Sequence, residues 1–156
     1  YFHGRVYPVR YCDLEILSIY GNNLFGSIPS EIGLLKNLTE FRADYNDLSG
    51  SLPTEFGLVK SLLHFSVRYN DITGFLPSEM FALTQLTLLH AASNHISGSI
   101  PSQIGLATCL QHLLLSTNGL SGTVPSEMGM LTELTELEIA SNNLSGSIAT
   151  HFGLLS

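Results

Sequence analysis

The chain has 156 residues, of which 44% are hydrophobic and 12% are charged, so it carries enough apolar material for one folded domain. Six Lys and Arg stand against thirteen Asp and Glu, which gives a formal net charge of −7. This balance argues against a surface for nucleic acid or anionic membrane, since both need clustered cations. No apolar run approaches the roughly 20 residues of a membrane span.

A strict repeat of 24 residues runs along the chain without insertion or deletion. Each repeat has an asparagine, at Asn22, Asn46, Asn70, Asn94, Asn118 and Asn142, and a glycine four residues later. Thr39, Phe41 and Ala43 alternate with more polar residues, as in a short strand whose side chains point to opposite faces. One strand per repeat predicts a stacked solenoid with a parallel sheet along one side.

The unit Leu38 to Pro53 shows the repeated pattern most clearly. Written as Leu-x-x-Leu-x-Leu-x-x-Asn-x-Leu-Ser/Thr-Gly-x-Ile-Pro-x-Glu-Ile-Gly, the pattern covers Leu14 to Leu155 and resembles the plant-type leucine-rich repeat. That class occurs in the ectodomains of receptor kinases and in polygalacturonase-inhibiting proteins. The resemblance implies an α/β solenoid: a superhelix with a concave parallel β-sheet, a short second β-sheet and 3-10 turns on the convex side.

The predicted organisation is a degenerate partial repeat followed by six full ones. Their bounds are 1–13 for the partial repeat and 14–37, 38–61, 62–85, 86–109, 110–133 and 134–156 for the repeats. Both ends would expose apolar core, whereas repeat arrays normally finish in polar capping units. We therefore expect a segment of a longer protein, or one whose ends rest on a partner.

Cys12 and Cys109 are the only cysteines, and they lie four repeats apart. At roughly 4.8 Å per strand this separation is too large for a disulfide between them. We expect each to be a small buried side chain, with Cys12 free to pair outside this segment. Secreted members of the plant-type leucine-rich-repeat class usually carry an N-terminal cap with paired cysteines, and nothing in this sequence matches that cap.

Strand positions between the inward leucines should face solvent on the concave side, where packing does not dictate the residue. Tyr and Arg are enriched at interface hot spots, and the matched spacing of Tyr45 and Tyr69 predicts adjacent rings. The alternative is that Tyr45 and Tyr69 only stack on each other while Arg42 and Arg68 pair with Asp44 and Glu40 across strands. The predicted partner-binding residues are Tyr20, Glu40, Arg42, Asp44, Tyr45, His64, Arg68, Tyr69, Leu88, His90, His112 and Leu114.

Four further residues are candidates away from the concave face. Phe25 and Phe75 break the repeat pattern beside its glycine, and we expect both to be exposed on the flank as a lateral contact. Asn37 and Asn143 begin the sequons Asn-Leu-Thr and Asn-Leu-Ser and are glycosylation candidates. The repeat consensus itself generates such triplets, so coincidence is the competing explanation.

The sequence predicts no enzyme, no cofactor and no metal. His64, His90 and His112 lie on a diagonal of roughly 8 Å steps, and no carboxylate or thiolate completes a closed site. Glu136 and Glu138 lie on an open sheet with no pocket that would desolvate one of them. Neither a glycine-rich phosphate loop nor a nucleophile motif is present.

The predicted function is therefore a non-enzymatic interaction domain that binds a protein or peptide on its concave face. One alternative is an accessory or structural subunit of a larger, membrane-associated assembly. Another is a hydrolase inhibitor of the polygalacturonase-inhibiting type, ranked last because the cysteine caps are missing. The sequons fit an extracellular or otherwise secretory location, with an organellar lumen as the alternative.

Overall fold

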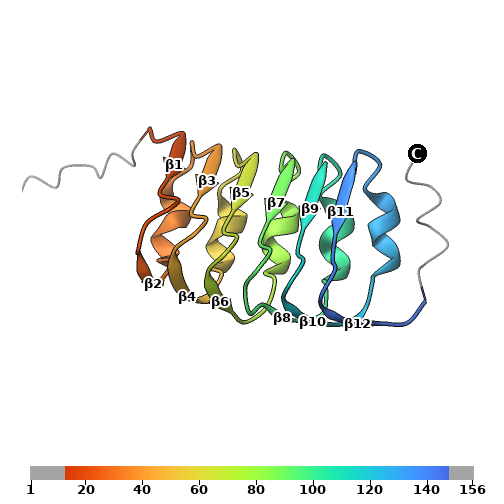
Figure 1. Cartoon of the computed structure of the whole chain (residues 1–156). Helices are drawn as coiled ribbons and strands as arrows, with labels where there is room; N and C mark the ends of the chain where they lie inside the picture. Colours follow the sequence, from red (N-terminus) through yellow and green to blue (C-terminus); the bar gives the residue numbers. More distant parts are fainter. Residues whose placement is uncertain (1–12, 148–156) are drawn as a thin grey trace, which may run out of the picture.

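The computed structural model describes residues 13–147. Within that range each 24-residue unit makes one turn of the chain, and the turns lie side by side in sequence order (Figure 1). The predicted partial repeat before Asp13, Cys12 and the end of the sixth repeat lie outside the described residues. We keep repeats one to six as the proposed division of the chain.

Six short strands form one parallel sheet along one side of the molecule. Adjacent strands pair at a constant offset of one repeat, so that Leu17 pairs with Phe41 and Phe41 with Phe65. The middle residue of each strand points into the core, and its two neighbours point outward. The strands are β1 (Ile16–Ser18), β3 (Glu40–Arg42), β5 (His64–Ser66), β7 (Leu88–His90), β9 (His112–Leu114) and β11 (Glu136–Glu138). This confirms the predicted sheet, and we refer to its outward side as the concave face.

The second sheet is present but divided into two three-stranded parts. One part consists of β2 (Phe25–Ser27), β4 (Asp47–Ser51) and β6 (Asp71–Thr73), and the other of β8 (Ser97–Gly98), β10 (Gly119–Thr123) and β12 (Asn143–Ser145). Between them there is an isolated bridge of Phe75 with Ser97 and a hydrogen bond from His95 N–H to Ile72 O at 2.8 Å, but no continuous pairing of strands. The break coincides with Phe75, whose ring lies so close to Gly98 that a Cβ there would be 2.5 Å from the ring Cδ1.

Within residues 13–147, five 3-10 turns cover the convex side, as the resemblance implies. They are η1 (Ser30–Leu34), η2 (Thr54–Leu58), η3 (Ser78–Ala82), η4 (Ser102–Leu106) and η5 (Ser126–Met130). Each follows a proline in extended conformation whose carbonyl accepts the first turn's hydrogen bond, as in Ile32 N–H to Pro29 O at 3.1 Å. Because its ring restricts φ to a range that includes this extended conformation, proline directs the chain from the second sheet into the turn.

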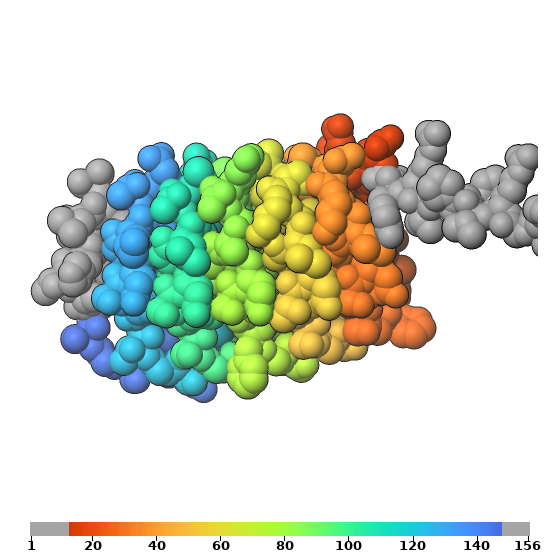
Figure 2. All heavy atoms as spheres, turned by 180° about the vertical axis from the view of Figure 1, so that it is seen from behind, coloured from red at the N-terminus to blue at the C-terminus, as the bar shows by residue number. Residues whose placement is uncertain are grey.

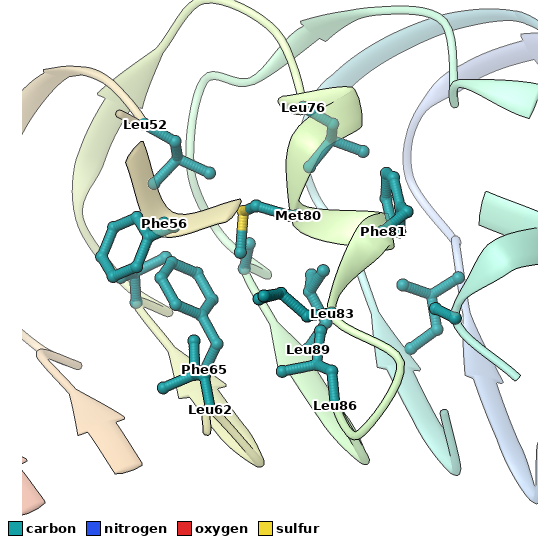
Figure 3. Close-up of a cluster of buried hydrophobic side chains, with 14 of the residues drawn as sticks. Leu52, Phe56, Leu62, Phe65, Leu76, Met80, Phe81, Leu83, Leu86 and Leu89 are labelled. Atoms are coloured by element: carbon teal, nitrogen blue, oxygen red, sulfur yellow. The ribbon is translucent and has the colours of Figure 1, made fainter. Parts of the chain in front are cut away.

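Stacking of the turns encloses one continuous apolar core, shown in part in Figure 3. Phe41, Phe56 and Phe65 form an aromatic cluster in it, with Phe41 and Phe65 stacked at 5.6 Å and Phe56 edge-on to both. Seen from the face opposite to that of Figure 1, the repeats form bands packed side by side (Figure 2). A single repeat could not bury these side chains, so the core exists only because neighbouring repeats cover each other.

The convex turns of adjacent repeats approach closely at a glycine. A Cβ on Gly57 would lie 2.7 Å from both the Cβ and the carbonyl oxygen of Glu79 in the next turn. Repeat three departs from this rule, since Phe81 occupies the equivalent position and is fully buried beside Leu76 and Met80 (Figure 3). Ala82 follows it where Leu34, Leu58, Leu106 and Met130 stand in the other repeats, so the large and small residues are exchanged.

We expect Gly57→Ala to lower the free energy of unfolding by about 1–3 kcal/mol, because the added methyl group overlaps backbone that cannot easily move. Gly26→Ala is the control, since nothing lies within 4 Å of its added Cβ and only the left-handed backbone (φ +88°) opposes it. That strain costs about 1–2 kcal/mol. Urea unfolding followed by circular dichroism measures both. A loss below about 1 kcal/mol for Gly57→Ala would mean that close approach does not select the glycine.

Candidate functional site

Two rows of side chains project from the concave face because the outer residues of each strand point away from the core. The first row is Ile16, Glu40, His64, Leu88, His112 and Glu136, and the second is Ser18, Arg42, Ser66, His90, Leu114 and Glu138. Pairing within each row matches the columns expected from the 24-residue spacing. The chemistry of the face therefore changes from repeat to repeat while its backbone stays the same.

Tyr45 and Tyr69 stack against each other just beyond the ends of β3 and β5. Their ring centroids are 4.7 Å apart and the planes differ by 10°. Both residues have positive φ, 54° and 52°, because the chain turns sharply here, and Gly21 holds the same position in the first repeat. A non-glycine residue in this conformation costs about 1–2 kcal/mol. The backbone strain places two aromatic rings, each about half exposed, at the rim of the face.

Arg68 holds this pair in place. Its Nη2 donates a hydrogen bond to the Tyr45 hydroxyl at 2.6 Å, and its guanidinium carbon lies 4.8 Å from the Tyr45 ring centroid. The distance to the Tyr69 ring centroid is 5.7 Å, so the cation also faces the second ring. The tyrosine pair and the arginine form one ordered unit rather than three independent side chains.

Asp44 lies under this unit and joins two strands. Its carboxylate accepts hydrogen bonds from the Ser66 hydroxyl and from the backbone N–H of Arg68, the latter at 3.0 Å. Ser66 is buried, and it was not among the predicted binding residues. The sequence could have indicated Ser66 as a site residue, because the 24-residue spacing puts it in the same row as Arg42 and His90.

A second polar group spans both rows and consists of Glu40, Arg42 and His64. Arg42 Nη2 lies 2.7 Å from Glu40 Oε2, and His64 Nδ1 lies 3.4 Å from Glu40 Oε1. The predicted alternative holds in part, since the two tyrosines stack and Arg42 pairs with Glu40, but neither arginine forms an ion pair across strands. Arg42 pairs with Glu40 inside its own strand, and the Arg68 guanidinium is bound to tyrosine.

A hollow of about 420 Å³ opens on the concave face between these groups. It is lined by Tyr20, Arg42, Asp44, Tyr45, Ser66, Arg68, Leu88 and His90, so residues from four repeats converge on it. The other predicted residues, Glu40, His64, Tyr69, His112 and Leu114, lie on the same face outside its lining. The hollow mixes aromatic, apolar and hydrogen-bond-donating groups, which suits an amphipathic ligand.

His90 lies in the wall of the hollow and has a lowered pKa. Burial lowers its pKa below the ordinary value of 6.5, and the charge of Arg68 lowers it further, against smaller opposing effects of Asp44, Glu138 and Glu136. The imidazole is therefore neutral at pH 7. Beyond the hollow, His112 Nδ1 lies 3.0 Å from Glu136 Oε2.

The remaining candidates lie away from the concave face. Phe25 and Phe75, on and just after strands of the second sheet, are 86% and 70% exposed. Asn37 and Asn143 are exposed as well. Cys109 is an exposed free thiol, so the expectation of a buried side chain is wrong. It lies in the loop between η4 and β9, where the repeat presents polar side chains to solvent.

Within residues 13–147 no three His, Cys, Asp or Glu side chains converge on a metal position. None of the helical turns in the described part of the chain has the length and apolarity that a membrane-crossing helix requires.

A family model described as Leucine Rich Repeat matches residues 13–35, 109–131 and 133–155. The chain has the leucine-rich-repeat fold. It resembles the ectodomains of plant receptor kinases, as solved structures show. A search of curated proteins finds no match.

One similar structure is the plant peptide hormone receptor RGFR1 in complex with RGF2, at 38% identity and a TM-score of 0.88 over 90% of this chain. Another is the Arabidopsis receptor kinase HAESA in complex with the peptide hormone IDA and the co-receptor SERK1, at 37% identity and a TM-score of 0.89 over 91%. This leucine-rich-repeat chain spans 22% and 24% of those two proteins. The ectodomain of the Arabidopsis thaliana receptor kinase SOBIR1 matches at 27% identity and a TM-score of 0.78, over 83% of this chain and 72% of that one.

Proposed function

We propose that this leucine-rich-repeat chain is a non-enzymatic recognition domain of a receptor-like ectodomain, and that it binds a peptide across repeats one to five of its concave face. The observation that carries the proposal is the hollow beside the stacked Tyr45 and Tyr69. RGFR1 and HAESA, which share this fold, are described as receptors in complex with peptide hormones. Their likeness supports an extracellular location and a peptide as the partner.

The side chains around the hollow are prepared for binding before any ligand arrives. Arg68 is fixed by Tyr45, and Asp44 by Ser66, so little side-chain entropy remains to be lost on association. Strands at about 4.8 Å spacing present successive rows that an extended chain crossing them can contact in turn. Leu88 and Leu114, one inside and one beyond the hollow, add half-buried apolar contacts along the same path.

A second contact on the flank is favoured by the exposure of Phe25 and Phe75. Two large apolar side chains that depart from the repeat consensus on the second sheet fit a protein partner docked laterally. This surface serves the alternative in which the chain is one subunit of a larger assembly. We also propose Asn37 and Asn143 as glycan attachment sites, since both are exposed, as an extracellular location requires.

The test is a peptide selection with the 156-residue chain against a displayed library of random dodecapeptides, followed by affinity measurement on synthetic peptides. We expect Tyr45→Ala with Tyr69→Ala to weaken binding by about 2 kcal/mol or more, roughly 30-fold, because the rim of the hollow is lost. Phe25→Ser is the control, since it removes an exposed aromatic ring from the flank and leaves the concave face intact. Unchanged affinity in a double variant with native circular dichroism would sink the proposal.

A further inference from the structure

The basic side chains of this acidic chain are unevenly distributed over its surface. Four Lys and Arg lie within the described residues of a chain with net charge −7. Lys36 and Lys60 donate to backbone carbonyls of the convex turns, including Gly33 O and Ala82 O. The other two, Arg42 and Arg68, both line the hollow. Half of the strong cations in this region therefore face one recess on the concave face.

The hollow also has more hydrogen-bond donors than acceptors. A guanidinium carries five N–H donors, and the contacts of Arg42 and Arg68 to Glu40 and Tyr45 engage only some of them. Asp44, the one carboxylate in the lining, already accepts from Ser66 and from a backbone N–H. The donors that these contacts leave free are open to a ligand, and a carboxylate matches a guanidinium group in charge and in geometry.

We propose that the hollow recognises the carboxylate of an Asp or Glu side chain of the bound peptide, with Arg42 and Arg68 as donors and His90 as a donor once it is protonated. The inference rests on the proposed function, because it names the residue type that the peptide must present. Tyr20, Tyr45 and Leu88 contact the apolar part of that side chain and of its neighbours.

His90 makes this recognition dependent on pH. In its row it lies between Ser66 and Leu114, with Glu138 one strand further. The charged groups that act on it are Arg68, Asp44, Glu138 and Glu136. A bound carboxylate favours the imidazolium and so opposes the lowering of the His90 pKa by burial and Arg68, which means that binding takes up a proton and tightens as the pH falls. An Asp or Glu side chain of the peptide stays ionised well below the ordinary pKa of histidine.

The experiment uses peptides selected from a random dodecapeptide library displayed without free C-termini, so that only side-chain carboxylates compete. We expect the selected sequences to share an Asp or Glu, and its replacement by Asn or Gln to weaken binding about 10- to 100-fold. In the Arg42→Gln variant the same replacement should cost at least about 3-fold less than in the wild type, since one of the two arginine donors is already gone. Glu133→Gln, a change of charge at an exposed residue in the loop between η5 and β11, should keep the full response of the wild type.

Binding peptides without a required acidic residue would overturn the inference and leave the proposed function standing. If no peptide binds the concave face, both fall. Affinity of the acidic peptide should also rise about 3- to 10-fold between pH 7.5 and pH 5.5, and this rise should vanish in His90→Gln. A His90→Gln variant with the full rise would remove His90 from the site.

Discussion

Replacing Asn70 by leucine is expected to lower the free energy of unfolding by about 3–5 kcal/mol, the largest effect at any single polar side chain here. The Asn70 side chain is buried between repeats two and three. Its Nδ2 donates to Ala43 O at 2.9 Å and to Val67 O at 3.0 Å, while its Oδ1 accepts from Leu48 N–H at 2.9 Å. Leucine has a similar branched shape and is larger than asparagine, so no cavity forms, and the loss comes from the unpaired backbone groups together with some crowding.

Asn142→Leu is the matched control. The amide of Asn142 makes the same set of bonds, to Leu115 O, Ile139 O and Leu120 N–H at 3.0–3.1 Å, but it is only partly buried. Water can replace the lost partners there, so a loss of about 1 kcal/mol is expected. Both variants are followed by chemical unfolding with circular dichroism. Equal losses of unfolding free energy at the two positions would show that burial does not determine how much a repeated asparagine stabilises the fold.

The asparagine that recurs in each repeat, from Asn22 to Asn142, also shows why so much of the fold could be predicted. A side chain that must satisfy backbone groups in two repeats can occur only at a fixed interval, and this fixes the register of every strand. The outward columns then follow from strand alternation, which is why residues far apart in sequence, such as Tyr20 and His90, could be placed on one face. Periodicity therefore determines which residues share a surface.

Periodicity does not determine what neighbouring side chains do with one another. Arg68 could pair with an acid or stack on tyrosine, and only its position above the Tyr45 ring favours the second arrangement. The sequence indicates only that Ser66 lies on the concave face, and the structure adds that its hydroxyl donates a hydrogen bond to Asp44. The exchange of glycine for Phe81 was equally hidden, because a convex position that is glycine elsewhere gives no sign that a ring can be buried there.

The aromatic core links the stability of the scaffold to the candidate site. Phe65 is the middle residue of β5, so its ring lies directly beneath the strand that carries Ser66 and leads to Arg68. It is fully buried against Phe41 and Phe56. The side chains that hold Asp44 and the tyrosine pair thus depend on a strand whose position is set by ring packing below it.

Phe65→Ala is therefore expected to lower the free energy of unfolding by about 3–5 kcal/mol, since it opens a cavity that the neighbouring rings cannot refill. It should also speed amide hydrogen exchange at Arg68, whose backbone N–H bonds to Asp44. Phe81→Ala is the control, because that ring is equally buried but belongs to the convex turn η3. A similar loss of stability with little change in exchange at Arg68 is expected there. Equal acceleration at Arg68 in both variants would mean that the site depends on global stability and not on the cluster beneath it.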